Sequence, residues 1–153
     1  MSADFAASIG TGDFDVVIYS ERNVGIPQAN VTALTQWVDA GNSAILSTWS
    51  PNVVINQLFE TSSVGVNFTS ATFTDEIVGL FLNEVPVSDT GWVTYSRQLQ
   101  PIGSAYTACS WANNTSCAVV GNGGKTINLG ILVDSLSLYH TEILVPNLIR
   151  QIL

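Results

Sequence analysis

The sequence predicts a single α/β domain over residues 1–153, with parallel strands in its N-terminal half and antiparallel hairpins in its C-terminal half. Two observations support this prediction. Between residues 14 and 60, short apolar runs alternate with stretches of helical character, which is the βαβα order of a parallel sheet. Further along the chain, short runs rich in Val, Ile and Leu flank turn residues, which is typical of hairpins.

The first predicted strand is the apolar run FDVVIYS at residues 14–20, which we expect to be buried on both faces. A helix is predicted over residues 27–40, because Pro27 suits a first helical turn and Gly41 suits the position after a helix end. Its apolar residues recur at helical spacing. These residues are Val31, Leu34 and Val38.

The second predicted strand is SAILSTW at residues 43–49, an apolar run that we also expect to be buried. Ser50 and Pro51 follow it, and they resemble an N-cap and a first helical residue. A second helix is therefore predicted over residues 52–60. Residues 61–108 alternate Thr or Ser with apolar residues, which indicates short antiparallel strands, although DEIVGLFL within them fits either a strand or a helix.

The two cysteines, Cys109 and Cys117, flank a stretch with an Asn-Asn pair suited to a turn. A hairpin would place the two sulfurs opposite each other and allow a disulfide, and the alternative is two buried free thiols.

The glycine-rich GNGGK at residues 121–125 lacks the spacing of a phosphate-binding loop, so we interpret it as a hairpin turn. A last helix has Leu144, Leu148 and Ile152 on one face, and Pro146 either starts or kinks it.

The chain is acidic, with a net charge of −8 and only four Lys and Arg residues. This charge excludes nucleic acid as an expected partner, because binding phosphates needs a basic surface. No apolar run is long enough to cross a membrane, so we expect no membrane insertion. The polar, lysine-poor composition favours an extracellular, surface or particle-associated protein, although the first 15 residues do not resemble a signal peptide.

Three stretches together, DFDVVIYS, ALTQWVDAGNSAILSTW and AVVGNGGKTINLG, followed by a closing helix, resemble the class I glutamine amidotransferase-like superfamily. The resemblance covers residues 13–60 and 117–153. It implies a three-layer, flavodoxin-like fold with a mainly parallel sheet and an antiparallel, hairpin-rich C-terminal half. Members usually have a strand-helix-strand unit before the first of these strands. This chain has only about 13 residues there, so we expect that unit to be missing and the sheet edge to be filled by later strands or a neighbouring chain.

Catalytic members of the superfamily have a cysteine nucleophile after the second of these strands. In this chain the corresponding stretch is STWSPN, which contains no cysteine, so the resemblance implies no amidotransferase activity. Other nucleophile candidates are Ser47, Thr48 and Ser50, but no G-x-S-x-G motif surrounds them. His140 and Glu142 have the His-x-Glu spacing of the superfamily but lie ten residues too late, and we expect them to be at a helix start.

These observations favour a non-catalytic structural or interaction domain that forms homo-oligomers or binds neighbouring domains of a larger assembly. One alternative is a carboxylate-based hydrolase or carbohydrate-processing enzyme with Glu21 and Arg22 at the carboxyl ends of the parallel strands. A weaker alternative is a module that binds glycans or small ligands. The sequence has no calcium-loop or zinc-site spacing, so we expect no metal and no cofactor.

Overall fold

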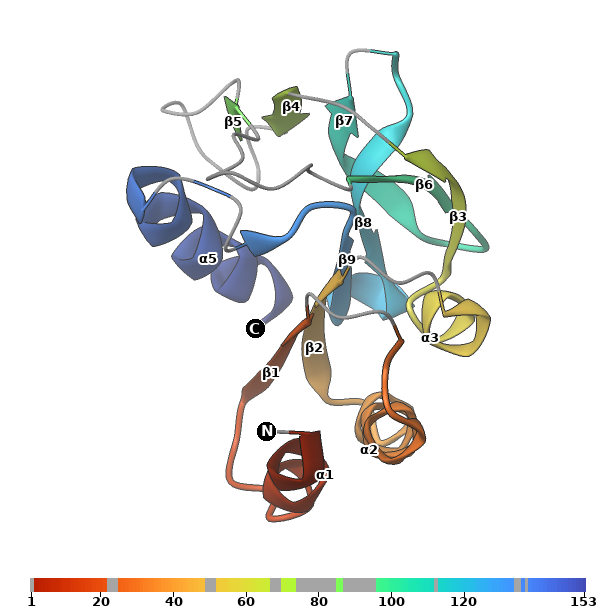
Figure 1. Cartoon of the computed structure of the whole chain (residues 1–153), viewed down its shortest axis with the longest axis vertical. Coiled ribbons are helices and arrows are strands. Elements are labelled where there is room, and N and C mark those ends of the chain that lie inside the picture. Colours follow the sequence, from red (N-terminus) through yellow and green to blue (C-terminus); the bar gives the residue numbers. More distant parts are fainter. Residues whose placement is uncertain are drawn as a thin grey trace.

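The computed structural model describes residues 2–21, 25–48, 52–66, 70–73, 85–86, 96–111, 113–133, 136 and 138–153 (Figure 1). Its helices are α1 Ser2–Ile9, α2 Gln28–Asp39, α3 Val53–Leu58 and α5 Leu138–Ile152, with a 3-10 turn at Asn122–Gly124. The strands are β1 Val16–Glu21, β2 Ser43–Thr48, β3 Thr61–Val66, β4 Ser70–Phe73, β5 Val85–Pro86, β6 Arg97–Pro101, β7 Tyr106–Trp111, β8 Ser116–Gly121 and β9 Thr126–Leu129. Helix α1 is an element that the sequence did not predict.

The described strands form one mixed sheet. Its main path runs β1-β2-β9-β8-β7-β4-β5, and the β3-β6 pair joins the path at β8. Strand β2 pairs in parallel with β1 and with β9. The other described pairings are antiparallel. The predicted α/β class is confirmed, and the parallel strands form the smaller part of the sheet.

Two apolar clusters lie on opposite faces of the central strands. In β2 all six residues are buried, and alternate side chains point to opposite faces, with Ile45 in one cluster and Ala44 and Leu46 in the other. Helix α5 packs on the Ile45 side, and α1, α2 and α3 pack on the other side (Figure 1). The fold therefore has three layers, with the sheet between two layers of helices.

Helix α2 ends as its sequence predicts. Gly41 has a φ of +83°, a conformation that costs glycine little. The Gly41 amide donates to the Val38 carbonyl, and the Asn42 amide donates to the Trp37 carbonyl. These two hydrogen bonds form a Schellman motif, which satisfies carbonyl groups that the helix end would otherwise leave free.

Strand β1 differs from its prediction. Its side chains alternate between buried and exposed, with Val17 and Tyr19 buried and Ile18 exposed. The reason is its position, because β1 lies at the edge of the sheet and pairs only with β2 among the described strands. Burial on both faces needs neighbours that an edge strand lacks.

The start of α3 also differs from its prediction. The N-cap is Asn52, whose Oδ1 accepts a hydrogen bond from the Ile55 amide at 3.1 Å. The expected cap, Ser50, and the expected first residue, Pro51, lie outside the described residues. An asparagine cap satisfies the first-turn amides as well as a serine does, so local sequence did not separate the two starts.

The two predicted hairpins are confirmed. Strands β7 and β8 are antiparallel neighbours, and Cys109 and Cys117 form a disulfide between them with Cα atoms 5.0 Å apart. Both cysteines are fully buried within the α5-side cluster. Strands β8 and β9 form the second hairpin, with the glycine-rich stretch as its turn. The predicted short antiparallel strands of the middle third are present as β3, β4 and β6, whereas DEIVGLFL lies outside the described residues.

Helix α5 contains Pro146 in its interior, so this proline does not start the helix. The predicted apolar face is confirmed, because Leu144, Leu148 and Ile152 are all buried in the cluster beneath α5. Burying one such side chain contributes roughly 1.5–3 kcal/mol relative to leaving it exposed.

No helix of the described chain is long and apolar enough to cross a membrane.

We expect the Cys109–Cys117 disulfide to stabilise the fold by about 2.5 kcal/mol, because it closes a short loop in the unfolded chain. Urea unfolding measured with dithiothreitol should therefore show a lower midpoint than unfolding without it. The C109A/C117A double variant is the control, since its midpoint should be the same in both conditions. Equal midpoints for the unmodified protein would contradict the expected contribution.

Candidate functional site

The carboxyl ends of the parallel strands β1, β2 and β9 meet at one edge of the sheet, which is where open α/β sheets bind ligands. Glu21 lies beside Thr48 in the β1–β2 register, and Ser47 lies beside Leu129 in the β2–β9 register. Two predicted candidates, Glu21 and Ser47, thus lie at this edge, but their side chains point to opposite faces of the sheet, because Ser47 pairs with Ser20 and Glu21 with Thr48. Other predicted residues of this region lie outside the described residues. They are Arg22, Trp49, Ser50 and Pro51.

Ser47 is fully buried, and both hydrogen-bonding functions of its hydroxyl are used. The Oγ donates to the Ile131 carbonyl at 3.0 Å and accepts from the Val133 amide at 3.0 Å. The hydroxyl proton is therefore directed at a backbone carbonyl. This geometry gives Ser47 a structural role, in which it ties the segment after β9 to the end of β2.

The predicted pair His140 and Glu142 lies in the first turns of α5. The Thr141 hydroxyl donates to the Val133 carbonyl at 3.2 Å, and Val133 also bonds to Ser47, so this helix start approaches the Ser47 segment. The Glu142 side chain is exposed, and the His140 side chain lies outside the described part of the chain. Residues two apart on a helix face different directions, so a shared target for both side chains is disfavoured.

The glycine-rich turn has a carboxylate where a phosphate would bind. Glu60 Oε2 accepts a hydrogen bond from the Asn122 backbone amide at 2.8 Å. Gly121 permits this approach, because a Cβ there would lie only 2.8 Å from the Phe59 carbonyl oxygen. The turn thus holds the end of α3 against β8 and β9. The anion that contacts the turn among the described residues is the Glu60 carboxylate, a group of the same chain.

A buried polar cluster around Arg97 is the functional feature that sequence reasoning missed. Arg97 Nη1 donates to Asn56 Oδ1 at 3.2 Å, and Nη2 donates to Asn128 Oδ1 at 2.9 Å and to the Leu129 carbonyl at 3.1 Å. Asn128 Nδ2 in turn donates to Thr61 Oγ1 at 2.7 Å. The cluster joins α3, β3, β6 and β9 just below the carboxyl end of the sheet. The sequence did contain a signal for the burial of Arg97. Side chains alternate between the two faces of a strand, so a buried Leu99 implies that Arg97, two residues earlier, also points inward.

Arg97 is a buried cation without a carboxylate partner among the described residues. Its side chain is 1% exposed, its hydrogen-bond acceptors are amide and carbonyl oxygens, and its Nε has no acceptor. Burial lowers the pKa of the guanidinium to about 10, and the group stays protonated at neutral pH. Buried charges are normally paired, whereas the described partners of this charge are neutral oxygen acceptors.

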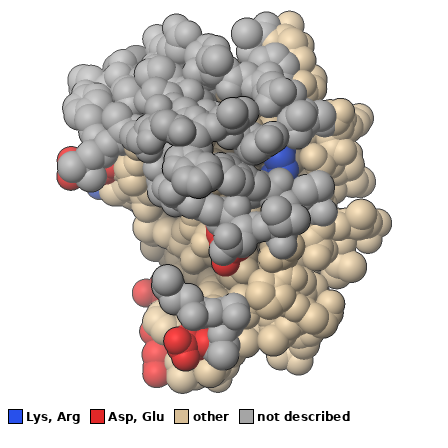
Figure 2. Space-filling model, in the orientation of Figure 1, with Lys and Arg blue, Asp and Glu red and all other residues tan. Residues whose placement is uncertain are grey.

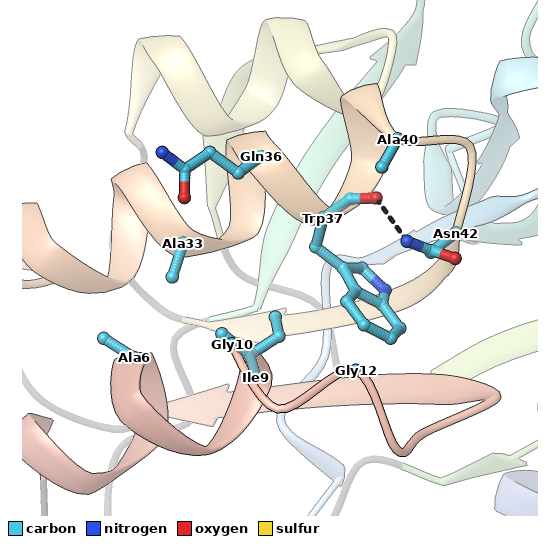
Figure 3. A pocket seen from close by; sticks show the side chains of 9 residues that line it. All are labelled: Ala6, Ile9, Gly10, Gly12, Ala33, Gln36, Trp37, Ala40 and Asn42. Carbon is cyan, nitrogen blue, oxygen red and sulfur yellow. Dashed lines mark hydrogen bonds between the residues drawn. The ribbon is translucent and has the colours of Figure 1, made fainter.

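Hollows on the surface of the described structure include two of similar size. One of about 260 Å³ lies between α1 and α2 (Figure 3). Its polar side chains are Gln36 and Asn42, and Asn42 Nδ2 is bonded to the Trp37 carbonyl at 3.2 Å. This hollow has no titratable lining residue. The other, of about 200 Å³, lies between α3 and β3 and includes Asn56 and Thr61 of the Arg97 cluster in its lining.

Metal ligation has little support in the described residues, since none of their His, Cys, Asp and Glu side chains gather in groups of three or more. Trp37 is buried, and its indole Nε1 donates to the Ser43 carbonyl at 2.9 Å. That position removes Trp37 as a stacking surface for sugars.

Comparison with known proteins gives matches to solved structures along nearly the whole chain. A putative GMP synthase subunit from Thermoplasma acidophilum superposes with a TM-score of 0.62 at 11% identity, covering 98% of this chain and 77% of that chain. The chain has the class I glutamine amidotransferase-like fold. The mmIFT52 N-terminal domain matches with a TM-score of 0.57 at 12% identity, covering 98% of this chain and 79% of that chain. No protein-family model and no curated protein matches the sequence.

These matches confirm the resemblance at the level of the fold and do not transfer an activity. The cysteine chemistry of catalytic amidotransferases requires a thiol. The whole sequence contains two cysteines, and both are used in the Cys109–Cys117 disulfide. The amidotransferase-like fold here therefore has no thiol nucleophile at the end of β2 or elsewhere.

Replacing Ser47 by alanine should destabilise the protein by about 1–3 kcal/mol, because the Ile131 carbonyl and the Val133 amide both lose their partner at a buried site. Chemical denaturation gives the free energy of unfolding. The matched control is Ser20→Ala on the exposed side of β1, which should change stability by less than about 0.5 kcal/mol. Equal effects of the two substitutions would argue against the structural role of Ser47.

Proposed function

We propose that this chain is a non-catalytic structural domain that self-associates through the edge strand β1 within an extracellular, surface or particle-associated assembly. The observation that carries the proposal is the state of β1. This strand pairs only with β2 in the described structure, and it presents Ile18, 39% exposed, beside the half-exposed Phe14. An edge of this kind is a template for pairing with another strand.

A second copy is the occupant that the proposal names. The backbone N–H and C=O groups of residues 16–20 on the side of β1 away from β2, where no described strand pairs, can form a ladder with the same strand of a partner, which would join two sheets into one. Ile18 would then be covered. A stable interface requires about 1,000 Å² or more of buried surface, so neighbouring groups such as the 10–15 turn would also contribute.

Charge sets the conditions for this association. Figure 2 shows carboxylates gathered around α1 and the turn that leads into β1, the region that holds the exposed Asp4, Asp13 and Asp15. Glu21 lies at the other end of the strand. Two copies with a net charge of −8 each repel one another, and salt screens this repulsion. The proposed association is therefore stronger at higher ionic strength.

Two features support the non-catalytic and extracellular parts of the proposal. The amidotransferase-like fold lacks a thiol nucleophile here, and the buried hydroxyl of Ser47 is committed to the backbone. A disulfide persists in oxidising compartments, which fits a protein that acts outside the cytosol.

Size-exclusion chromatography with light scattering tests the proposal. The average mass should rise above that of the 16.3 kDa chain with protein concentration, and more steeply at high salt than at low salt. Ile18→Lys should weaken association at least about tenfold, because it places a charge on the edge strand. The control is Val64→Lys, at an exposed apolar residue of β3, a strand that does not pair with β1. A monomer at every concentration and salt level, or equal effects of both variants, would overturn the proposal.

A further inference from the structure

The hollow between α3 and β3 combines hydrogen-bond donors with an apolar rim. It has a volume of about 200 Å³ and is open to solvent. Val53 and Ile102 on its rim are 69% and 46% exposed. The polar side chains that line it are amides and hydroxyls, with no acidic or basic group. They are Asn56, Gln57, Thr61, Ser62 and Ser63.

The side chain of Asn56 links this hollow to Arg97. Its Oδ1 accepts from Arg97 Nη1 at 3.2 Å and from Asn128 Nδ2 at 3.3 Å, and these two donors fix which end of the amide is the oxygen. The Nδ2 end donates to no acceptor among the described residues. Asn56 lines the hollow, and the bond from the cation to Oδ1 polarises its amide, which makes Nδ2 a stronger donor.

Arg97 adds a positive contribution to the field in this hollow, whose described lining residues are neutral. The Arg97 guanidinium lies one hydrogen bond behind Asn56 and has no carboxylate partner in the described structure. Inside a protein a charge acts more strongly over such a distance than in water. Thr61 is already engaged, since its hydroxyl donates to the Asn56 carbonyl at 3.0 Å and accepts from Asn128. Ser62 and Ser63 supply further hydroxyl donors at the wall.

We propose that this hollow binds a small organic carboxylate with a short apolar tail. The carboxylate oxygens accept hydrogen bonds from the Asn56 amide and the Ser62 and Ser63 hydroxyls, within the field of Arg97. The tail lies against Val53 and Ile102. The volume suits a molecule of a few carbon atoms. This inference does not depend on the self-association proposed above, because the hollow lies on α3 and β3 and not on β1.

A single negative charge fits this site better than a phosphate does. One buried cation balances one carboxylate, whereas a dianion would remain uncompensated on a chain of net charge −8. A metal ion is disfavoured by the positive charge behind Asn56. The apolar rim adds a preference for a carbon chain over a bare inorganic anion.

Titration with butyrate, followed by the backbone amide resonances of residues 53–63, tests the proposal. Shifts in these resonances should saturate with butyrate, while the neutral butyramide, inorganic phosphate and chloride at matched ionic strength should give no saturable shift. Absence of saturable shifts with butyrate, or equal shifts with butyramide or phosphate, would overturn it.

Two variants separate charge recognition from folding. Asn56→Asp places a carboxylate against Arg97 and neutralises the site, so butyrate affinity should fall at least about tenfold. Val53→Asp adds a negative charge at the rim, where the side chain is exposed and an acid is favoured in the first turn of α3, so the fold is retained while affinity falls similarly. The matched control is Asn113→Asp in the exposed β7–β8 turn, which should keep affinity within about twofold. Retention of butyrate affinity by Val53→Asp would contradict the proposal even if Asn56→Asp failed to fold.

Discussion

The buried arginine at the start of β6 is the interaction on which much of the fold depends. The side chain of Arg97 joins α3 through Asn56 and β9 through Asn128 and Leu129. Its backbone amide donates to the Gly130 carbonyl at 2.6 Å, and its carbonyl accepts from the Trp111 indole at 3.0 Å. One residue thus connects β6 to β7, β9 and α3. The β3-β6 pair meets the main sheet through a single described register pair at β8, so these contacts fix the position of that branch.

The backbone next to this arginine explains why a glycine ends β9. A Cβ at Gly130 would overlap the Arg97 carbonyl oxygen, and the Gly130 amide donates to the Cys117 carbonyl at 2.6 Å. The close approach of two backbones therefore requires the absence of a side chain at this point. The same junction lies beside the buried disulfide, so a covalent link between β7 and β8 and a charged hydrogen-bond network among α3, β3, β6 and β9 stabilise neighbouring parts of the sheet. Each constrains the region where the parallel and antiparallel parts of the sheet meet.

Local signals predicted the elements whose environment is set by near neighbours in sequence. Gly41 identified the end of α2, and the Asn-Asn and glycine-rich turns identified the two hairpins. The burial of β1 was predicted wrongly, because the lateral position of a strand in a sheet is decided by pairing and leaves no trace in a short apolar run. The Arg97 cluster was missed for a related reason, since Arg97 and Asn128 lie far in sequence from Asn56 and Thr61, and only the folded sheet brings them together.

The end of the sheet where amidotransferases place a nucleophile has different chemistry in this chain. The Ser47 hydroxyl donates its proton to a backbone carbonyl and so holds the segment after β9. If Ser47 acted as a nucleophile, this hydrogen bond would be lost. Near the same edge, Arg97 orients two asparagine amides, because the Oδ1 atoms of Asn56 and Asn128 both accept hydrogen bonds from its guanidinium. A nucleophilic site needs a base and a free proton path, whereas a network of oriented donors around a cation attracts an anion without reacting with it. At this end of the sheet the described residues thus place oriented amides around a buried cation, and they bond the Ser47 hydroxyl to the backbone.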